Sequence, residues 1–335
     1  MKKMKKALLL IFTMVLVSAA FAQQQFAVLN HNDTISAFYG INALSQAHSA
    51  AVGGDIITLS SGVFNGIGIT KPVTIRGAGM WSIDSLQIQN TVILTDITLN
   101  IPFDSTYSLE MEGLFISGAT YYTQAYNPVF KKCRFGWHFS RNSNGTMTNA
   151  QFINCVLSWY NGDGLTGTQF INSVIFDGLS APSQLDHCVA RIYPSVNTLT
   201  SMVVYNSVVY ENTSEQPDFN SSSSYYSIGI NPFVYNSYYY RYFDITNVTG
   251  HHLWNKRAYN QVFKYWNGTY SEGLSFELLD DVAASYLGDD STQVGIYGGL
   301  YPFDPVVRPV IGTVNAARRT NADMKLEVEI NLINE

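Results

Sequence analysis

The stretch Asn154-Cys155-Val156-Leu157 returns, with substitutions of the same kind, along the middle of the chain. Each copy has a polar residue, a small Cys or Ser, a residue of outward type that is usually Val, and an apolar residue. Such a recurrence predicts a stacked solenoid in which each repeat is one coil. The other copies are Lys132-Cys133-Arg134-Phe135, Asn172-Ser173-Val174-Ile175, His187-Cys188-Val189-Ala190, Asn206-Ser207-Val208-Val209 and Asn236-Ser237-Tyr238-Tyr239.

The spacing of these copies indicates strands rather than helices. From Asp96, where a weaker copy begins, to Asn206 the mean step is about 18 residues. Helical repeats run to about thirty residues or more, whereas short coils rich in Val, Ile, Phe, Tyr and Thr suit strands joined by bends. The steps are uneven, as expected where the loops vary in length while the strands stay in register.

The columns of the repeat have distinct physical roles. The last position is the core column, and the polar position is a bend at which Asn satisfies backbone groups. Three cysteines share the small column, and we expect buried free thiols, because stacked parallel side chains seldom reach the torsion of a disulfide. No Cys-x-x-Cys or His pairing accompanies them, so no metal site is predicted. These cysteines are Cys133, Cys155 and Cys188.

Three further segments carry a family resemblance. The stretches from Gly54 to Gly62 and from Ile69 to Gly79 resemble the first coils of secreted right-handed parallel β-helix proteins of the pectate-lyase-like superfamily, and Ser291 to Gly299 resembles their closing segment. The resemblance covers roughly residues 37–301. It implies an all-β, right-handed parallel β-helix of about nine to ten coils, and it implies no particular activity, because one fold hosts many functions.

The first 22 residues have the pattern of a secretory signal peptide. A start with four Lys is followed by an apolar run from Ala7 to Val17 and by the small residues Ala20-Phe21-Ala22. The apolar run is shorter than the ~20 residues that a membrane span needs. We therefore expect cleavage near Ala22-Gln23, no membrane span, and a secreted, periplasmic or outer-surface protein.

Cleavage would leave a β-helix domain at residues 23–301 and a tail at residues 302–335. The mature chain would carry 15 Lys and Arg against 25 Asp and Glu, a net charge of −10. That charge argues against nucleic acid and anionic lipid as partners. Few residues are charged, so neutral polar residues must cover much of the surface.

Three segments depart from the repeat. Residues from Thr34 to Ser49 place apolar side chains at near-helical spacing, which predicts a short capping helix over the first coil. His251 to Asp290 is a long excursion rich in Trp, Tyr and Lys, after which we expect the last coil to close near Tyr297. The tail contains a linker and an alternating strand from Lys325 to Leu332, which either packs on the end of the solenoid or is the trace of a terminal domain or sorting signal.

Catalytic groups are only weakly indicated. The resemblance implies that an enzyme of this fold pairs a calcium site of clustered carboxylates with a Lys or Arg base, or sets several Asp residues around a glycosidic bond. No column of Asp forms here, and Asn161-Gly162-Asp163-Gly164 is first of all a turn sequence. The catalytic candidates are Asp163, Arg191 and Asp177. An enzyme would need three of five side chains to converge in one cleft: Asp163, Asp177, Asp186, Arg191 and Glu211.

Aromatic residues follow the recurring phrase at two positions that can face outward. Stacked coils about 4.8 Å apart would display them along one face, where rings stack on sugars and polar neighbours bond hydroxyl groups. Alternatively, they pack under loops or form a second core strand. His187 stands in the polar column and is expected to be a bend residue. The substrate-binding candidates are Trp137, Trp159, Tyr210, Tyr240 and, in the excursion, Trp254.

Two classes of function follow. The first is an exported, non-catalytic β-helix that binds glycan or another cell-surface component, or serves as a structural element of the envelope. The second is a polysaccharide lyase or glycoside hydrolase acting on an extracellular polysaccharide. The first is favoured because no carboxylate constellation emerges. We expect a monomer whose partner is a polysaccharide or an envelope component, with no cofactor; calcium would enter only under the lyase alternative.

Overall fold

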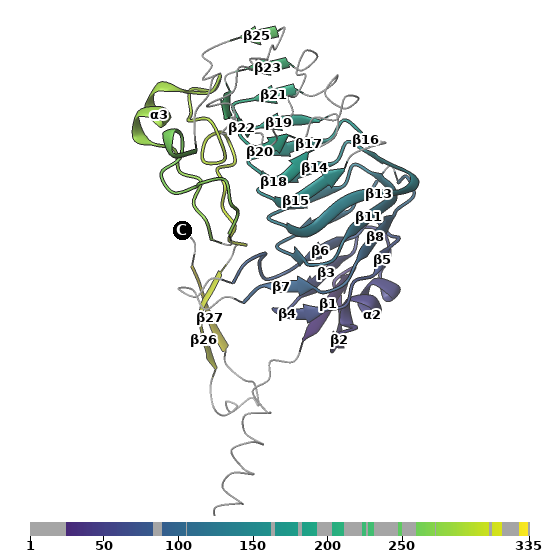
Figure 1. Cartoon of the computed structure of the whole chain (residues 1–335). Helices are drawn as coiled ribbons and strands as arrows, with labels where there is room; N and C mark the ends of the chain where they lie inside the picture. The colour runs from purple at the N-terminus through teal and green to yellow at the C-terminus, as the bar shows by residue number, and fades with distance from the viewer. Residues whose placement is uncertain are drawn as a thin grey trace, which may run out of the picture.

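The computed structural model is a parallel β-solenoid built from two long sheets (Figure 1). The interior between the sheets holds the main hydrophobic core. The structure describes residues 25–82, 89–104, 106–161, 165–179, 183–192, 203–210, 223–225, 227–230, 247–249, 259–271, 273–307, 310–316 and 328–333.

The first sheet adds one parallel strand per coil. The solenoid completes about seven turns, fewer than the nine to ten coils expected from the sequence. Two antiparallel strands, β1 and β2, close its lower edge. The order is β2 (Thr34–Tyr39), β1 (Phe26–His31), β3 (Ile56–Leu59), β6 (Thr74–Arg76), β9 (Glu110–Glu112), β12 (Val129–Lys131), β14 (Gln151–Ile153), β17 (Gln169–Ile171), β19 (Gln184–Asp186), β21 (Val203–Tyr205), β23 (Ser223–Tyr225) and β25 (Asn247–Thr249).

The second sheet runs beside the first and carries the longest strand. Its main path is β24 (Ile228–Ile230), β22 (Val208–Tyr210), β20 (Val189–Ile192), β18 (Val174–Leu179), β15 (Val156–Asn161), β13 (Arg134–Thr148), β10 (Phe115–Ile116), β7 (Thr91–Ile93) and β4 (Gly62–Phe64). Four further strands join it at the side: β5 (Gly68–Ile69), β8 (Ile97–Asn100), β11 (Thr120–Tyr126) and β16 (Leu165–Thr166).

The polar position of the recurring phrase is a left-handed bend between the two sheets, as the sequence predicts. All five described copies have φ between 45° and 54° at this residue. Asn adopts this conformation more easily than other residues with a side chain, which explains its recurrence. We name these five residues the bend column: Lys132, Asn154, Asn172, His187 and Asn206.

The interior confirms the other two columns. The last position of the phrase is buried in every described copy: Phe135, Leu157, Ile175, Ala190 and Val209. On the first sheet, Phe130, Phe152 and Phe170 stack on successive coils with ring centroids 4.8 Å apart. The three cysteines are buried and free. The thiol of Cys155 lies 3.3 Å from the carbonyl oxygen of Phe130 in the coil below, and the hydroxyl of Ser173 makes the same contact with Phe152. A small side chain with a weak donor therefore suits this column.

The N-terminal cap differs from the predicted single helix. Thr34 to Tyr39 form β2, and only Ala43–Ala50 form a helix, α2, which buries Leu44 and Ala47 against the first coil. The reason is the turn Asn32-Asp33, in which both residues have positive φ. That pair of angles suits the two-residue turn of a β-hairpin, so the chain folds back as a strand before the helix begins.

The excursion covers the outer face of the second sheet. Its described part contains η4 (Tyr259–Gln261) and α3 (Asp280–Ser285). Phe263, Trp266 and Phe276 belong to a second hydrophobic cluster together with the outward valines of the recurring phrase. These valines point away from the interior and are still buried, because the excursion packs on them. They are Val156, Val174, Val189 and Val208.

The sequence predicts a last coil that closes near Tyr297, and this prediction is wrong. Residues 289–307 instead form a strap that runs back along the bend column. At the start of the strap, Asp289 accepts a hydrogen bond from Nδ2 of Asn206. Near its end, Asp304 accepts one from Nζ of Lys132. Between these ends, Asn172 donates to the carbonyl oxygens of Ile296 and Gly298 at 2.9 and 2.7 Å. Polar side chains at the bends thus have a second role as anchors.

Beyond the strap the tail forms two strands rather than the one predicted. β26 (Val310–Ala316) pairs with β27 (Val328–Ile333) in an antiparallel hairpin. The predicted signal peptide and its cleavage position lie outside the described residues. Within the part of the chain that the structure describes, no helix is long and apolar enough to span a membrane.

Candidate functional site

Two of the predicted binding residues project from neighbouring coils of the second sheet. Trp137 on β13 is 60% exposed, and Trp159 on β15 is 46% exposed. The strands are parallel, and His138 pairs with Trp159. Trp137 therefore lies on the strand next to that of Trp159, one residue before the residue that pairs with Trp159.

A bulge turns Trp137 outward. Phe135 pairs with Leu157 and His138 with Trp159, so Gly136 and Trp137 lie opposite a single residue, Ser158. A bulge of this kind re-aims side chains along a strand. Gly136 fits here because a Cβ on it would lie 2.8 Å from the ring of Phe115 on the coil below.

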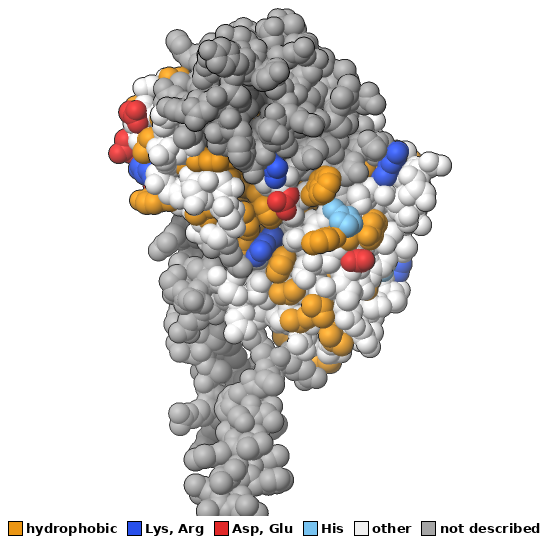
Figure 2. All heavy atoms as spheres, viewed as in Figure 1, with side chains coloured by type: hydrophobic (Ala, Val, Ile, Leu, Met, Phe, Trp, Pro, Cys, Tyr) orange, Lys and Arg blue, Asp and Glu red, His pale blue; other side chains and the backbone are white. Residues whose placement is uncertain are grey.

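His138 and Tyr121 extend the exposed face by one more coil. The Tyr121 hydroxyl lies 3.3 Å from Nε2 of His138, and the two rings meet edge to face with centroids 5.7 Å apart. The rings of Trp137 and His138 are 5.6 Å apart. We name Tyr121, Trp137, His138 and Trp159 the aromatic surface. Figure 2 shows a face of the molecule on which hydrophobic side chains and a histidine gather beside acidic and basic groups.

Polar groups flank the aromatic surface. Ser158 donates a hydrogen bond of 2.6 Å to Oδ2 of Asp177 on the next coil. Arg134 lies over the ring of Phe115, 4.3 Å from its centroid. Exposed rings beside carboxylate and imidazole groups can stack on an apolar ring face and bond hydroxyl groups at its edges.

Tyr210 is a correction to the predicted set. It is only 1% exposed, because the excursion folds over β22 and places Trp266 4.7 Å from its ring. Its hydroxyl donates to the carbonyl oxygen of Phe176, and burial raises the pKa of Tyr210 well above its usual range. Tyr210 thus follows the alternative that aromatics pack under loops. Tyr240 and Trp254 lie outside the described residues.

The catalytic candidates are only partly brought together. Asp177 on β18 and Arg191 on β20 lie on adjacent strands, and both act electrostatically on Tyr210. Asp186 ends β19 in the other sheet, where it lies 2.9 Å from Nδ1 of His187. The positions of Asp163 and Glu211 are outside the described residues. Among the residues that are described, no three His, Cys, Asp or Glu side chains gather so as to hold a metal ion.

His187 is a bend residue, as predicted, with a buried ring held on both sides. Nδ1 faces Asp186, and Nε2 lies 3.1 Å from Oγ1 of Thr292 in the strap. Its role is to fasten the strap.

The sequence did not single out the pair of Tyr121 and His138 as part of a surface. Their contact joins two coils, and Tyr121 precedes the clearest copies of the repeat. Comparison with protein-family models, with curated proteins and with solved structures finds no match to this chain.

Proposed function

We propose that this protein is exported and binds a polysaccharide, without cleaving it, through the aromatic surface. The observation that carries the proposal is the exposure of Trp137 and Trp159 on neighbouring coils. A contiguous group of exposed apolar side chains with polar residues around it marks an interaction site, whereas exposed apolar residues scattered singly are normal. A glycan is the partner class that uses such rings together with hydroxyl-bonding neighbours.

An extended ligand suits the geometry better than a small one. Successive coils stand about 4.8 Å apart, and the aromatic surface draws on three of them, through β11, β13 and β15. The backbone ladder holds these strands in fixed register, so the rings are arranged before a ligand arrives. Binding then costs little ordering of the protein, which favours affinity.

The absence of cleavage is proposed from the acidic groups. Of the three described members of the five-residue set, Asp177 and Arg191 share one region, whereas Asp186 lies at the bend column. A single carboxylate that already accepts a hydrogen bond from Ser158 is a poor match for chemistry that needs two carboxylates or a calcium site. Asp177 beside Arg191 is the one observation that favours the alternative, a lyase or hydrolase.

The test is a binding panel with the mature chain. Acidic and neutral polysaccharides are cast in native gels, and retardation of the protein is measured alongside any release of reducing or unsaturated ends. We expect retardation by at least one polysaccharide without cleavage. The double variant Trp137→Ala/Trp159→Ala should weaken retardation at least tenfold, because both stacking rings are lost.

The matched control is Tyr265→Ala. Tyr265 is 66% exposed but belongs to the excursion and not to β11, β13 or β15, so its loss should leave retardation unchanged. Cleavage of any polysaccharide would overturn the non-catalytic proposal in favour of the enzyme. Equal effects of the two variants, or no retardation by any polysaccharide, would remove the aromatic surface as a glycan site.

A further inference from the structure

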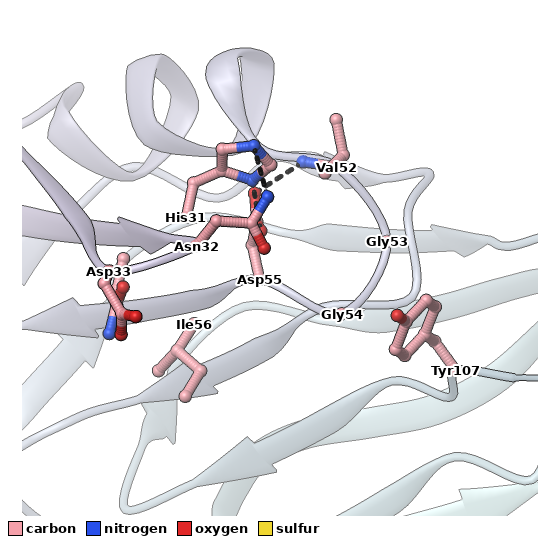
Figure 3. Close-up of a pocket in the computed structure, with 10 residues that line it drawn as sticks. His31, Asn32, Asp33, Val52, Gly53, Gly54, Asp55, Ile56 and Tyr107 are labelled. Carbon is pink, nitrogen blue, oxygen red and sulfur yellow. Dashed lines mark hydrogen bonds and ion pairs between the residues drawn. The ribbon is translucent and has the colours of Figure 1, made fainter.

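A hollow of about 380 Å³ opens at the N-terminal end of the solenoid, and none of its lining residues belongs to the aromatic surface. Three separate stretches form it: the end of the β1–β2 hairpin, the loop before β3, and Tyr107. Figure 3 shows Asp33 and Tyr107 on opposite sides of this cap pocket, with His31 and Asp55 between them.

The inner wall of the cap pocket is fixed by hydrogen bonds. Asp55 is buried, and its two carboxylate oxygens are engaged, one with Nδ1 of His31 at 2.8 Å and the other with the backbone N–H of Val52 at 2.8 Å. The Nδ2 group of Asn32 lies 3.2 Å from Nε2 of His31. Since an amide nitrogen only donates, this contact makes Nε2 the acceptor and leaves the proton on Nδ1, facing Asp55.

The opposite wall is a ring set against glycine. Gly54 has φ +88°, and a Cβ on it would lie 2.6 Å from the Tyr107 ring. Asp104 accepts hydrogen bonds from the backbone N–H groups of Thr106 and Tyr107, at 2.7 and 3.1 Å, which holds the loop. The Tyr107 side chain is nevertheless 48% exposed, so part of the ring is open to a ligand.

The chemistry of the lining narrows the ligand class. No Lys or Arg occurs among the described residues that line the cap pocket, and His31 already faces Asp55, so the lining offers no unpaired cation to an anionic ligand. The structure brings together no metal-binding group of three in the described residues. What remains is the carboxylate of Asp33, the amide of Asn30, the Asn32 amide oxygen and the N–H that is not directed at His31, and an aromatic ring. Amides and carboxylates bond pairs of hydroxyl groups, and a ring face takes the apolar side of a sugar.

We infer that the cap pocket binds a single neutral sugar residue, as a free mono- or disaccharide or as the end of a glycan chain. The sugar packs on Tyr107 and its hydroxyl groups bond to Asp33 and the asparagine amides. The volume lies at the small end of the range for ligand pockets, about 300–1,000 Å³. This site is separate from the aromatic surface and does not rest on the function proposed for it.

The inference is tested by saturation-transfer NMR and calorimetry of the mature chain with glucose, galactose, mannose, maltose and lactose. We expect at least one of them to bind. Asp33→Gly should weaken that binding at least tenfold while preserving the hairpin, because Gly suits the positive φ of this turn position. Tyr107→Ala should do the same, whereas Tyr107→Phe, which keeps the ring, should retain most of the affinity.

The controls separate this site from the other one and from misfolding. Asn127→Gly makes the same kind of change at another exposed residue of positive φ and should bind as the parent does. The Trp137→Ala/Trp159→Ala variant should also keep its affinity for the small sugar. The inference is overturned if none of the five sugars binds, if Asp33→Gly binds normally, or if only charged probes such as galacturonate or glucosamine bind.

Discussion

At the scale of single residues, the small column shows how one position accepts either Cys or Ser. Cys188 and Ser207 occupy it on successive coils, and each points its sulfur or oxygen at a backbone carbonyl. The site is too small for a larger apolar side chain and too dry for a charge. Its cysteines are therefore best understood as fillers with a weak donor, not as reactive groups.

This leads to a prediction about thiol reactivity. Burial raises the pKa of Cys133 and of Cys188 to about 12, and raises that of Cys155 as well. The thiolate, which is the reactive form, is therefore not populated at pH 8 in the folded protein. We expect no reaction with Ellman's reagent at pH 8 under native conditions and three thiols per chain in denaturant. A fast-reacting thiol in the native protein would contradict the buried column.

The sequence predicts the columns of the repeat well, but it does not predict which distant segments their side chains contact. The left-handed bend at Asn154 or Asn172 follows from residue type and spacing alone, since both are local properties. That Asn172 also bonds to Ile296, 124 positions later, is not predictable from spacing, because the contact depends on where the strap runs. In the same way the sequence offers Trp137 and Tyr210 alike as outward aromatics, but a bulge turns Trp137 outward while the excursion buries Tyr210.

At the scale of elements, the strap is the feature that links distant coils. Its anchors come from the bend column, and its far end passes Gly113, where a Cβ would lie 2.4 Å from Val307. Phe115 pairs with Arg134, so Gly113 stands level with Lys132 of the bend column, and a side chain at this position would collide with the strap. The strap thus bonds to polar side chains of the bend column and approaches the backbone closely at Gly113, which has no side chain.

The contribution of one anchor can be isolated by a pair of glycine variants. Asn172→Gly keeps the positive φ but leaves the carbonyl oxygens of Ile296 and Gly298 without their donor. Asn149→Gly makes the same change at a positive-φ residue whose side chain instead bonds to Asn127. We expect Asn172→Gly to cost about 1–3 kcal/mol more, measured by urea unfolding, with faster amide exchange along the strap. Equal losses in the two variants would mean that the strap bonds contribute nothing.

At the scale of the whole molecule, two hydrophobic clusters lie on opposite sides of the second sheet. One fills the interior, and the other lies between the sheet and the excursion. Leu157 belongs to the first and Val156, its neighbour on β15, to the second, as strand alternation requires. The solenoid was predictable from the repeat, whereas the cover was not, because its residues follow no period.

We expect the second cluster to unfold locally without unfolding of the solenoid. Trp266 is 2% exposed in the second cluster, and Trp266→Ala should cost about 3–5 kcal/mol there. We expect protease cleavage within residues 259–286 while the β-sheet circular dichroism is retained. Phe152→Ala, in the interior stack, removes a ring of the solenoid itself and should lower the stability of both parts. Loss of the sheet signal in the Trp266 variant would show that the cover is needed for the coils to form.

The direction of the strap has a mechanical consequence. The chain enters it at the coil of Asn206 and leaves it at the coil of Gly113, so it travels against the order in which the coils were built. Tension applied beyond residue 307 would reach the Lys132 anchor first and the Asn206 anchor last. The anchors would then break one after another. The peak force would be set by the strongest single anchor and not by the combined strength of all of them.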